Sequence, residues 1–113
     1  MFFKIENEIF NSLNFQCYEY ENEILDLYFN GKVAIKIKQS INEFNSFLDL
    51  LSENKNILHI DKIGINIKNI SGISKDNENT VFYFVDGSAR NINLKFSEIE
   101  NKLLGEWCLK FLI

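Results

Sequence analysis

Proline is absent from this 113-residue chain, histidine and tryptophan occur once each, and there are two cysteines. The two cysteines, Cys17 and Cys108, are too few for a disulfide framework, so we expect reduced thiols. The five glycines stand apart from one another, which excludes a glycine-rich loop that cradles phosphate. No group of histidines, cysteines and acids has the spacing of a metal site. We therefore expect neither a metal nor a cofactor.

The scarcity of histidine also limits catalysis. Any nucleophile activated by an imidazole must use His59, with Cys17 and Asp61 as its candidate partners. No serine lies in a nucleophile-elbow sequence. A lone histidine between apolar neighbours is usually structural. We expect a protein that is not an enzyme and keep as an alternative a small enzyme or ligand-binding domain centred on His59.

Long apolar runs and an excess of positive charge are missing as well. Apolar runs reach about five residues, far short of the ~20 that span a bilayer, and the acidic N-terminus is no signal peptide. The net charge is −4, and phosphate neutralisation needs clustered lysine and arginine, so nucleic acid is not an expected partner. We expect a cytoplasmic protein without membrane contact. Lysine almost replaces arginine, a codon preference of a low-GC bacterium or its phage.

One stretch, Val81–Leu104, predicts strand, turn, strand and helix in that order. It opens on five β-branched and aromatic residues, and Asp86-Gly87 follows as a hairpin signal. Alternating apolar and polar residues then predict a second strand. Ser97 and Glu100 have the spacing of a capping box, in which the serine hydroxyl and the glutamate each bind the other residue's amide. An apolar stripe at helical spacing follows the box.

The same order occurs earlier, in Leu25–Leu51. Here the turn signal is Asn30-Gly31, and the capping box is Ser40 with Glu43. The two segments agree in pattern rather than in residue identity. The sequence therefore predicts two ββα units.

For residues 1–113 we predict a single α+β domain with an antiparallel β-meander sheet and three helices, in the order α-βββ-α-ββββ-α. Apolar residues at helical spacing predict a helix over residues 2–13, although the first six residues also fit an edge strand. A bulge or bend is expected near Lys68–Asn69, where the apolar alternation changes phase.

A sheet face that combines tyrosines with a few charges is the first candidate site. It forms if the Asn30-Gly31 loop has an odd residue count, which sets the strand register. Such a face is typical of protein-binding surfaces, although the N-terminal helix could instead cover it and bury the rings. The C-terminal helix is the second candidate, because it stays apolar to the last residue. The expected partner-binding residues are Tyr18, Tyr20, Tyr28, Asp26, Lys36, Lys38, Trp107 and Phe111.

These observations favour a small protein-binding module of the inhibitor, immunity or anti-defence type. Its partner would be a protein of unknown identity, with a homodimer as an alternative. The element order is also similar to that of the small acidic chaperones of type III secretion, which wrap an effector segment as dimers. That similarity implies a secretion-type chaperone as a second interpretation.

Overall fold

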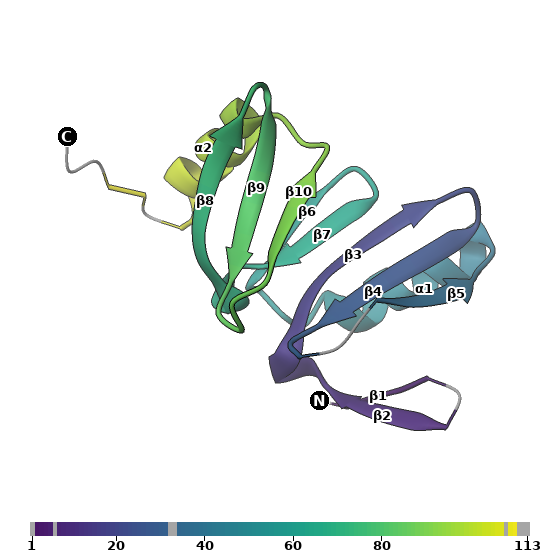
Figure 1. Ribbon diagram of the computed structural model, residues 1–113. Helices are drawn as coiled ribbons and strands as arrows, with labels where there is room; N and C mark the ends of the chain where they lie inside the picture. The colour runs from purple at the N-terminus through teal and green to yellow at the C-terminus, as the bar shows by residue number, and fades with distance from the viewer. Residues whose placement is uncertain (1, 6, 32–33, 108, 111–113) are drawn as a thin grey trace. The chain divides into compact units, whose positions relative to one another are not determined.

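The computed structural model describes residues 2–5, 7–31, 34–107 and 109–110. Within these residues the chain has a mixed α+β fold with antiparallel sheets, ten strands and two α-helices (Figure 1). The elements are β1 (Phe2–Ile5), β2 (Glu8–Asn11), η1 (Ser12–Asn14), β3 (Phe15–Glu21), β4 (Ile24–Phe29), β5 (Ile35–Lys38), α1 (Ile41–Leu51), β6 (Ile57–Ile60), β7 (Ile63–Asn66), η2 (Ile67–Asn69), β8 (Ile70–Asp76), β9 (Asn79–Phe84), β10 (Ala89–Ile92) and α2 (Phe96–Glu106).

The chain divides into two compact units, Met1–Ile70 and Ser71–Ile113, called the first and the second unit below. The first unit is built on a five-stranded antiparallel sheet in the order β5-β4-β3-β7-β6. Helix α1 lies along one face of that sheet (Figure 1). The second unit holds the three-stranded sheet β10-β9-β8 and α2. That residues 1–113 behave as a single domain stays a prediction.

The core of the first unit lies between the sheet and α1. Leu25 pairs with Ile37 and Leu27 with Ile35, so these apolar residues share the inner face, as the odd Asn30-Gly31 loop predicted. Phe44, Phe47 and Leu51 of α1 pack against this face. The buried members of the cluster are Phe15, Tyr18, Tyr20, Leu25, Leu27, Phe29, Phe44, Phe47, Leu51 and Ile57.

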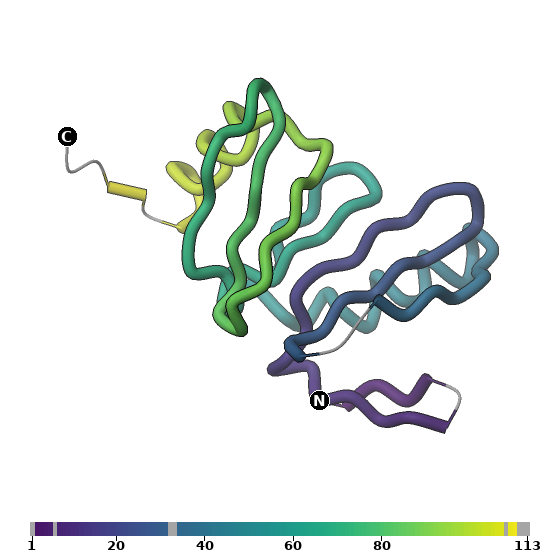
Figure 2. The backbone as a smooth tube through the Cα atoms, in the orientation of Figure 1, coloured from purple at the N-terminus to yellow at the C-terminus, as the bar shows by residue number. Residues whose placement is uncertain are grey.

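The N-terminal helix predicted over residues 2–13 is wrong. Strands β1 and β2 form an antiparallel hairpin (Figure 2). In it Phe3 pairs with Phe10. Both rings pack on the core, Phe10 stacked on Phe29 at a centroid distance of 4.5 Å. Three residues at helical spacing, Phe2, Ile9 and Leu13, point to solvent instead, with 68%, 68% and 69% of their surface exposed. Burial of alternate aromatic residues therefore outweighs the helical spacing.

Besides the β1–β2 hairpin, the predicted order lacks strand β8. Its sequence, ISGISKD, has a glycine and only two apolar residues, so it shows no clear alternation. The expected bend at Lys68–Asn69 is present as η2, a single turn that precedes β8. The observed order therefore has more strands and, within the described residues, two α-helices in place of three.

Both predicted ββα segments are present, as β4-β5-α1 and β9-β10-α2, but only one predicted cap forms. Ser40 caps α1 through its hydroxyl, and Glu43 binds the Ser40 amide in return. Helix α2 begins at Phe96, so its N-cap is Lys95 and no side chain caps it. The prediction that Ser97 is an N-cap is therefore wrong.

Candidate functional site

The predicted tyrosine face is not assembled as expected. Tyr18 pairs with Leu27 and Tyr20 with Leu25, which places both rings on the inner face of the sheet. Tyr18 is fully buried, and Tyr20 stacks on Phe44 of α1 at a centroid distance of 4.1 Å. These two tyrosines are core residues because β3 has the opposite parity to the one assumed. The element that covers them is α1.

The rest of the predicted face lies on the outer side of the sheet. Asp26 pairs with Lys36 across β4 and β5, and their side chains form an ion pair at 3.0 Å. Lys38 lies on the same side, exposed, whereas Tyr28 is buried beside Cys17. An exposed pair of this kind contributes at most about 1 kcal/mol. The charges gather as expected, and the tyrosines do not join them.

The outer side of β3–β5 is acidic. A shallow hollow there is lined by Lys36 and Lys38 and by the carboxylates of Glu19, Glu21 and Asp26. Carboxylates therefore outnumber ammonium groups around it. This surface suits neither phosphate nor another anion.

The C-terminal candidates are only partly described. Trp107 follows the last residue of α2 and is half-buried. Phe111 lies outside the described residues, so its predicted role as a contact residue stays a prediction.

His59 has a structural role. Its Nδ1 lies 2.7 Å from the hydroxyl of Tyr18, which burial keeps protonated by raising its pKa. Partial burial lowers the pKa of His59, which favours the uncharged imidazole, and the tautomer of the ring decides whether Nδ1 or the hydroxyl accepts in this bond. Gly64 on β7 pairs with Tyr18 on one side and with His59 on the other, and it lies under the Tyr18 ring, where a Cβ would overlap the ring atoms.

Among the described residues, no group of three His, Cys, Asp or Glu side chains could hold a metal ion.

A cluster of buried amides fixes the loops at one end of the first unit. Gln16 donates to the Asn30 side chain at 2.9 Å, and Asn30 donates to Asn69 at 3.3 Å. Asn69 and Asn66 both donate to the carbonyl of Phe15, at 2.7 and 2.9 Å. These bonds join η2 to the start of β3. Asparagines that reflect codon preference in the sequence thus serve as structural anchors in the fold.

The anchored loops surround a hollow of about 460 Å³ with two exposed lysines, Lys55 and Lys68. Lys68 is held because its amide donates to the Asn66 side chain at 3.2 Å. The loop of Lys55 is held by a bond of 2.9 Å from the Ile67 amide to the Asn56 carbonyl. We call this site the lysine hollow; its lining also includes Ser12, Leu13, Glu53, Asn54 and Asn56.

The lysine hollow has the opposite charge balance to the outer sheet face. Two ammonium groups face one carboxylate, that of Glu53, among neutral amide and hydroxyl groups. Helix α1 ends beside the hollow, and a helix C-terminus carries partial negative charge. The positive charge of the hollow therefore comes from the two lysines and not from the end of this helix. Lysine and amide donors on a fixed frame are the groups that contact a phosphate backbone.

Sequence reasoning missed this site. Lys55 lies between two asparagines, and Lys68 precedes another, but the asparagines were attributed to codon preference. The signal in the sequence that could have indicated this site is the presence of asparagines next to both lysines.

Within the described residues, no helix is long and apolar enough to cross a membrane.

No family model and no curated protein matches this chain. A solved structure does: the LytTr DNA-binding domain of a protein described as a methyl-accepting/DNA response regulator from Bacillus cereus. The two chains superpose with a TM-score of 0.59 and 14% sequence identity, over 93% of this chain and 95% of the other. At this identity the likeness shows a shared fold.

This finding corrects the functional expectations. The neighbour is a DNA-binding domain, which contradicts the expected protein-binding module of the inhibitor, immunity or anti-defence type, and equally the chaperone and the enzyme centred on His59. It also contradicts the expectation that nucleic acid is not a partner. That expectation relied on the net charge of −4, and a net charge does not reveal how charges are distributed over the surface.

Proposed function

We propose that this chain is a DNA-binding domain that acts by binding rather than by catalysis, in the cytoplasm. The observation that carries the proposal is the likeness to a LytTr DNA-binding domain over nearly the full length of both chains. The lysine hollow supports it, since it gathers cations and amide donors in a chain that is acidic as a whole.

The proposal assigns phosphate contact to Lys55 and Lys68, both exposed and on hydrogen-bonded loops. Each lysine that neutralises a phosphate releases condensed counterions, so affinity falls as salt rises. Two such contacts give a slope of log K against log salt of about −2, which is shallow for a DNA-binding protein. A domain with two such contacts must gain its remaining affinity from uncharged contacts.

The test uses the whole chain and a labelled pool of random-sequence duplex DNA. Bound duplexes are selected and sequenced, and the enriched duplex is then titrated by fluorescence anisotropy. The double variant Lys55→Gln/Lys68→Gln should bind it about ten-fold more weakly, as expected for two charged phosphate contacts of about 0.7 kcal/mol each. The slope with salt should become shallower by about two.

The acidic outer face supplies the matched control. Lys36→Gln/Lys38→Gln removes the same charge from the same unit, at a face where carboxylates outnumber lysines. This variant should retain wild-type affinity. Equal loss in both double variants would reduce the effect to net charge, and no enrichment of any duplex would contradict DNA binding itself.

A further inference from the structure

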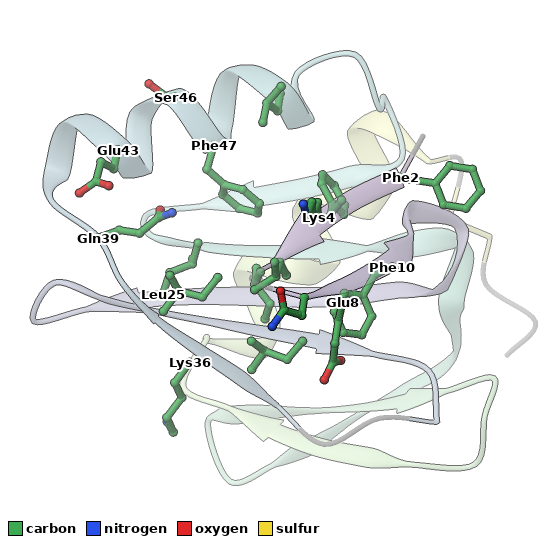
Figure 3. A pocket seen from close by; sticks show the side chains of 17 residues that line it. Phe2, Lys4, Glu8, Phe10, Leu25, Lys36, Gln39, Glu43, Ser46 and Phe47 are labelled. Carbon is green, nitrogen blue, oxygen red and sulfur yellow. The ribbon is translucent and has the colours of Figure 1, made fainter.

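The lysine hollow differs in charge from an apolar groove of the same unit. This groove, of about 820 Å³, lies between the β1–β2 hairpin, strands β4 and β5, and α1 (Figure 3). The carboxylates of Glu8 and Glu43 line it. The ammonium groups of Lys4 and Lys36 line it as well, so the groove favours neither sign of charge. An anionic ligand is therefore drawn to the lysine hollow rather than to the groove.

The lysine hollow also has exposed apolar side chains in its lining. Leu13 is 69% exposed and Leu50 is 56% exposed, and both line the hollow together with Lys55 and Lys68. Single exposed leucines are common on protein surfaces and need no explanation. Two of them at one cationic hollow are different, because a ligand held by the lysines also covers apolar groups.

Hydrogen bonds on both sides of Leu13 fix the turn that carries it. In η1 the Leu13 amide donates to the Asn11 side chain at 3.0 Å, and the Leu13 carbonyl accepts from the Asn69 side chain at 2.7 Å. Asn69 directly follows Lys68, so Leu13 and Lys68 belong to one hydrogen-bonded frame. Phosphate contacts set the register of a protein on a duplex. A phosphate at Lys68 therefore fixes where the side chain of Leu13 lies on the DNA.

The edges of the bases in duplex DNA offer one apolar group, the 5-methyl group of thymine in the major groove. This groove is about 12 Å wide and admits an α-helix, so the single turn η1 fits into it. We propose that the side chain of Leu13 contacts this methyl group and makes the domain specific for a thymine. The proposal rests on DNA binding through the lysine hollow and adds an uncharged base contact to its phosphate contacts.

The test replaces each thymine of the enriched duplex in turn by deoxyuridine, which pairs identically and lacks only the 5-methyl group. Fluorescence anisotropy measures each affinity. At one position the wild type should bind the uracil duplex about four-fold more weakly, the loss expected for one buried methyl group. At that position Leu13→Ala should bind the thymine duplex and the uracil duplex equally.

Ile9→Ala is the matched control. Ile9 is as exposed as Leu13, belongs to the same unit and lies outside the lining of the lysine hollow. This variant should keep the full response to uracil. Circular dichroism establishes that both variants are folded.

The outcomes separate this contact from DNA binding itself. If no thymine position responds to uracil, or if the response survives Leu13→Ala, the thymine contact is overturned, while the salt slope of Lys55→Gln/Lys68→Gln still decides DNA binding. If Leu13→Ala weakens binding equally with thymine and with uracil, Leu13 contacts a sugar or inserts between base steps, which also overturns the proposal. No enrichment of any duplex overturns DNA binding and the thymine contact together.

Discussion

Helix α1 in the first unit and helix α2 in the second begin in different ways, although each has a serine followed by a glutamate three residues later. At α1 the Ser40 hydroxyl accepts from the Glu43 amide at 3.2 Å, and the Glu43 carboxylate accepts from the Ser40 amide at 3.0 Å. At α2 the corresponding serine, Ser97, lies inside the helix, and its N-terminus has no side-chain cap.

The residues before α2 explain the difference. Thr80 on β9 donates to the Leu94 carbonyl at 2.8 Å, and the Phe96 amide donates to the Glu78 carbonyl at 3.0 Å. These bonds hold the chain on strand β9 up to the first helical residue, so the helix starts before Ser97. A capping sequence therefore determines where a helix begins only if no hydrogen bond from another part of the chain fixes an earlier first residue.

The largest effect we predict tests whether the two units share one folding transition. Phe29→Ala removes a buried ring from the aromatic cluster of the first unit and should cost about 3–5 kcal/mol in free energy of unfolding. The single tryptophan, Trp107, lies in the second unit. If residues 1–113 are one domain, urea unfolding followed by its fluorescence shifts as far as unfolding followed by circular dichroism. An unshifted tryptophan transition would mean that the units unfold separately.

Two glycines, one in each unit, should respond to alanine with opposite signs. In Gly64→Ala the new Cβ meets the buried Tyr18 ring between two strands, and overpacking of this kind costs about 1–3 kcal/mol. In α2, a Cβ added at Gly105 would have open space within 4 Å, so Gly105→Ala should stabilise by up to about 1 kcal/mol. Thermal unfolding of both variants measures the contrast. A stable Gly64→Ala protein would contradict the position of Tyr18.

The two serines give the smallest contrast. Ser40→Ala should cost about 1 kcal/mol, whereas Ser97→Ala should change the stability by less than about 0.5 kcal/mol. Chemical denaturation at pH 7 measures both. Equal losses would mean that Ser97 does cap α2 in solution.

The cap of α1 also predicts a dependence on pH. The hydrogen bond from the Ser40 backbone amide, and after it the bond with the Ser40 side chain, lower the pKa of Glu43 below its usual value. A carboxyl with a lowered pKa in the folded state contributes stability above its unfolded pKa and loses it as the pH falls through its folded pKa. The stability difference between wild type and Glu43→Gln should therefore shrink in acid. A difference that is constant from pH 7 to pH 3 would contradict the capping box.

Sequence patterns predicted the fold well where a single rule decided the outcome. The turn at Asp86-Gly87 and the cap at Ser40 depend on neighbouring residues, and both are present. Patterns failed where distant residues decided. The N-terminal hairpin forms because Phe3 and Phe10 reach the ring of Phe29, a contact that the helical spacing of residues 2–13 does not reveal.

The candidate site was less predictable than the fold. Asp26 and Lys36 could be paired from strand register alone, because both lie in one hairpin. Lys55 and Lys68 share a hollow only because buried asparagines join η2 to the start of β3 and the Ile67 amide holds the loop of Lys55 to η2. Net charge summed over the chain hides such a pair, and this is why an acidic composition made nucleic acid an unexpected partner.

The most direct test of the account is the salt dependence of binding to the enriched duplex, measured for the wild type, Lys55→Gln/Lys68→Gln and Lys36→Gln/Lys38→Gln. DNA binding through the lysine hollow predicts a slope of log K against log salt of about −2 for the wild type and for the outer-face variant, and a slope near zero for the hollow variant. One common slope for all three proteins would contradict it.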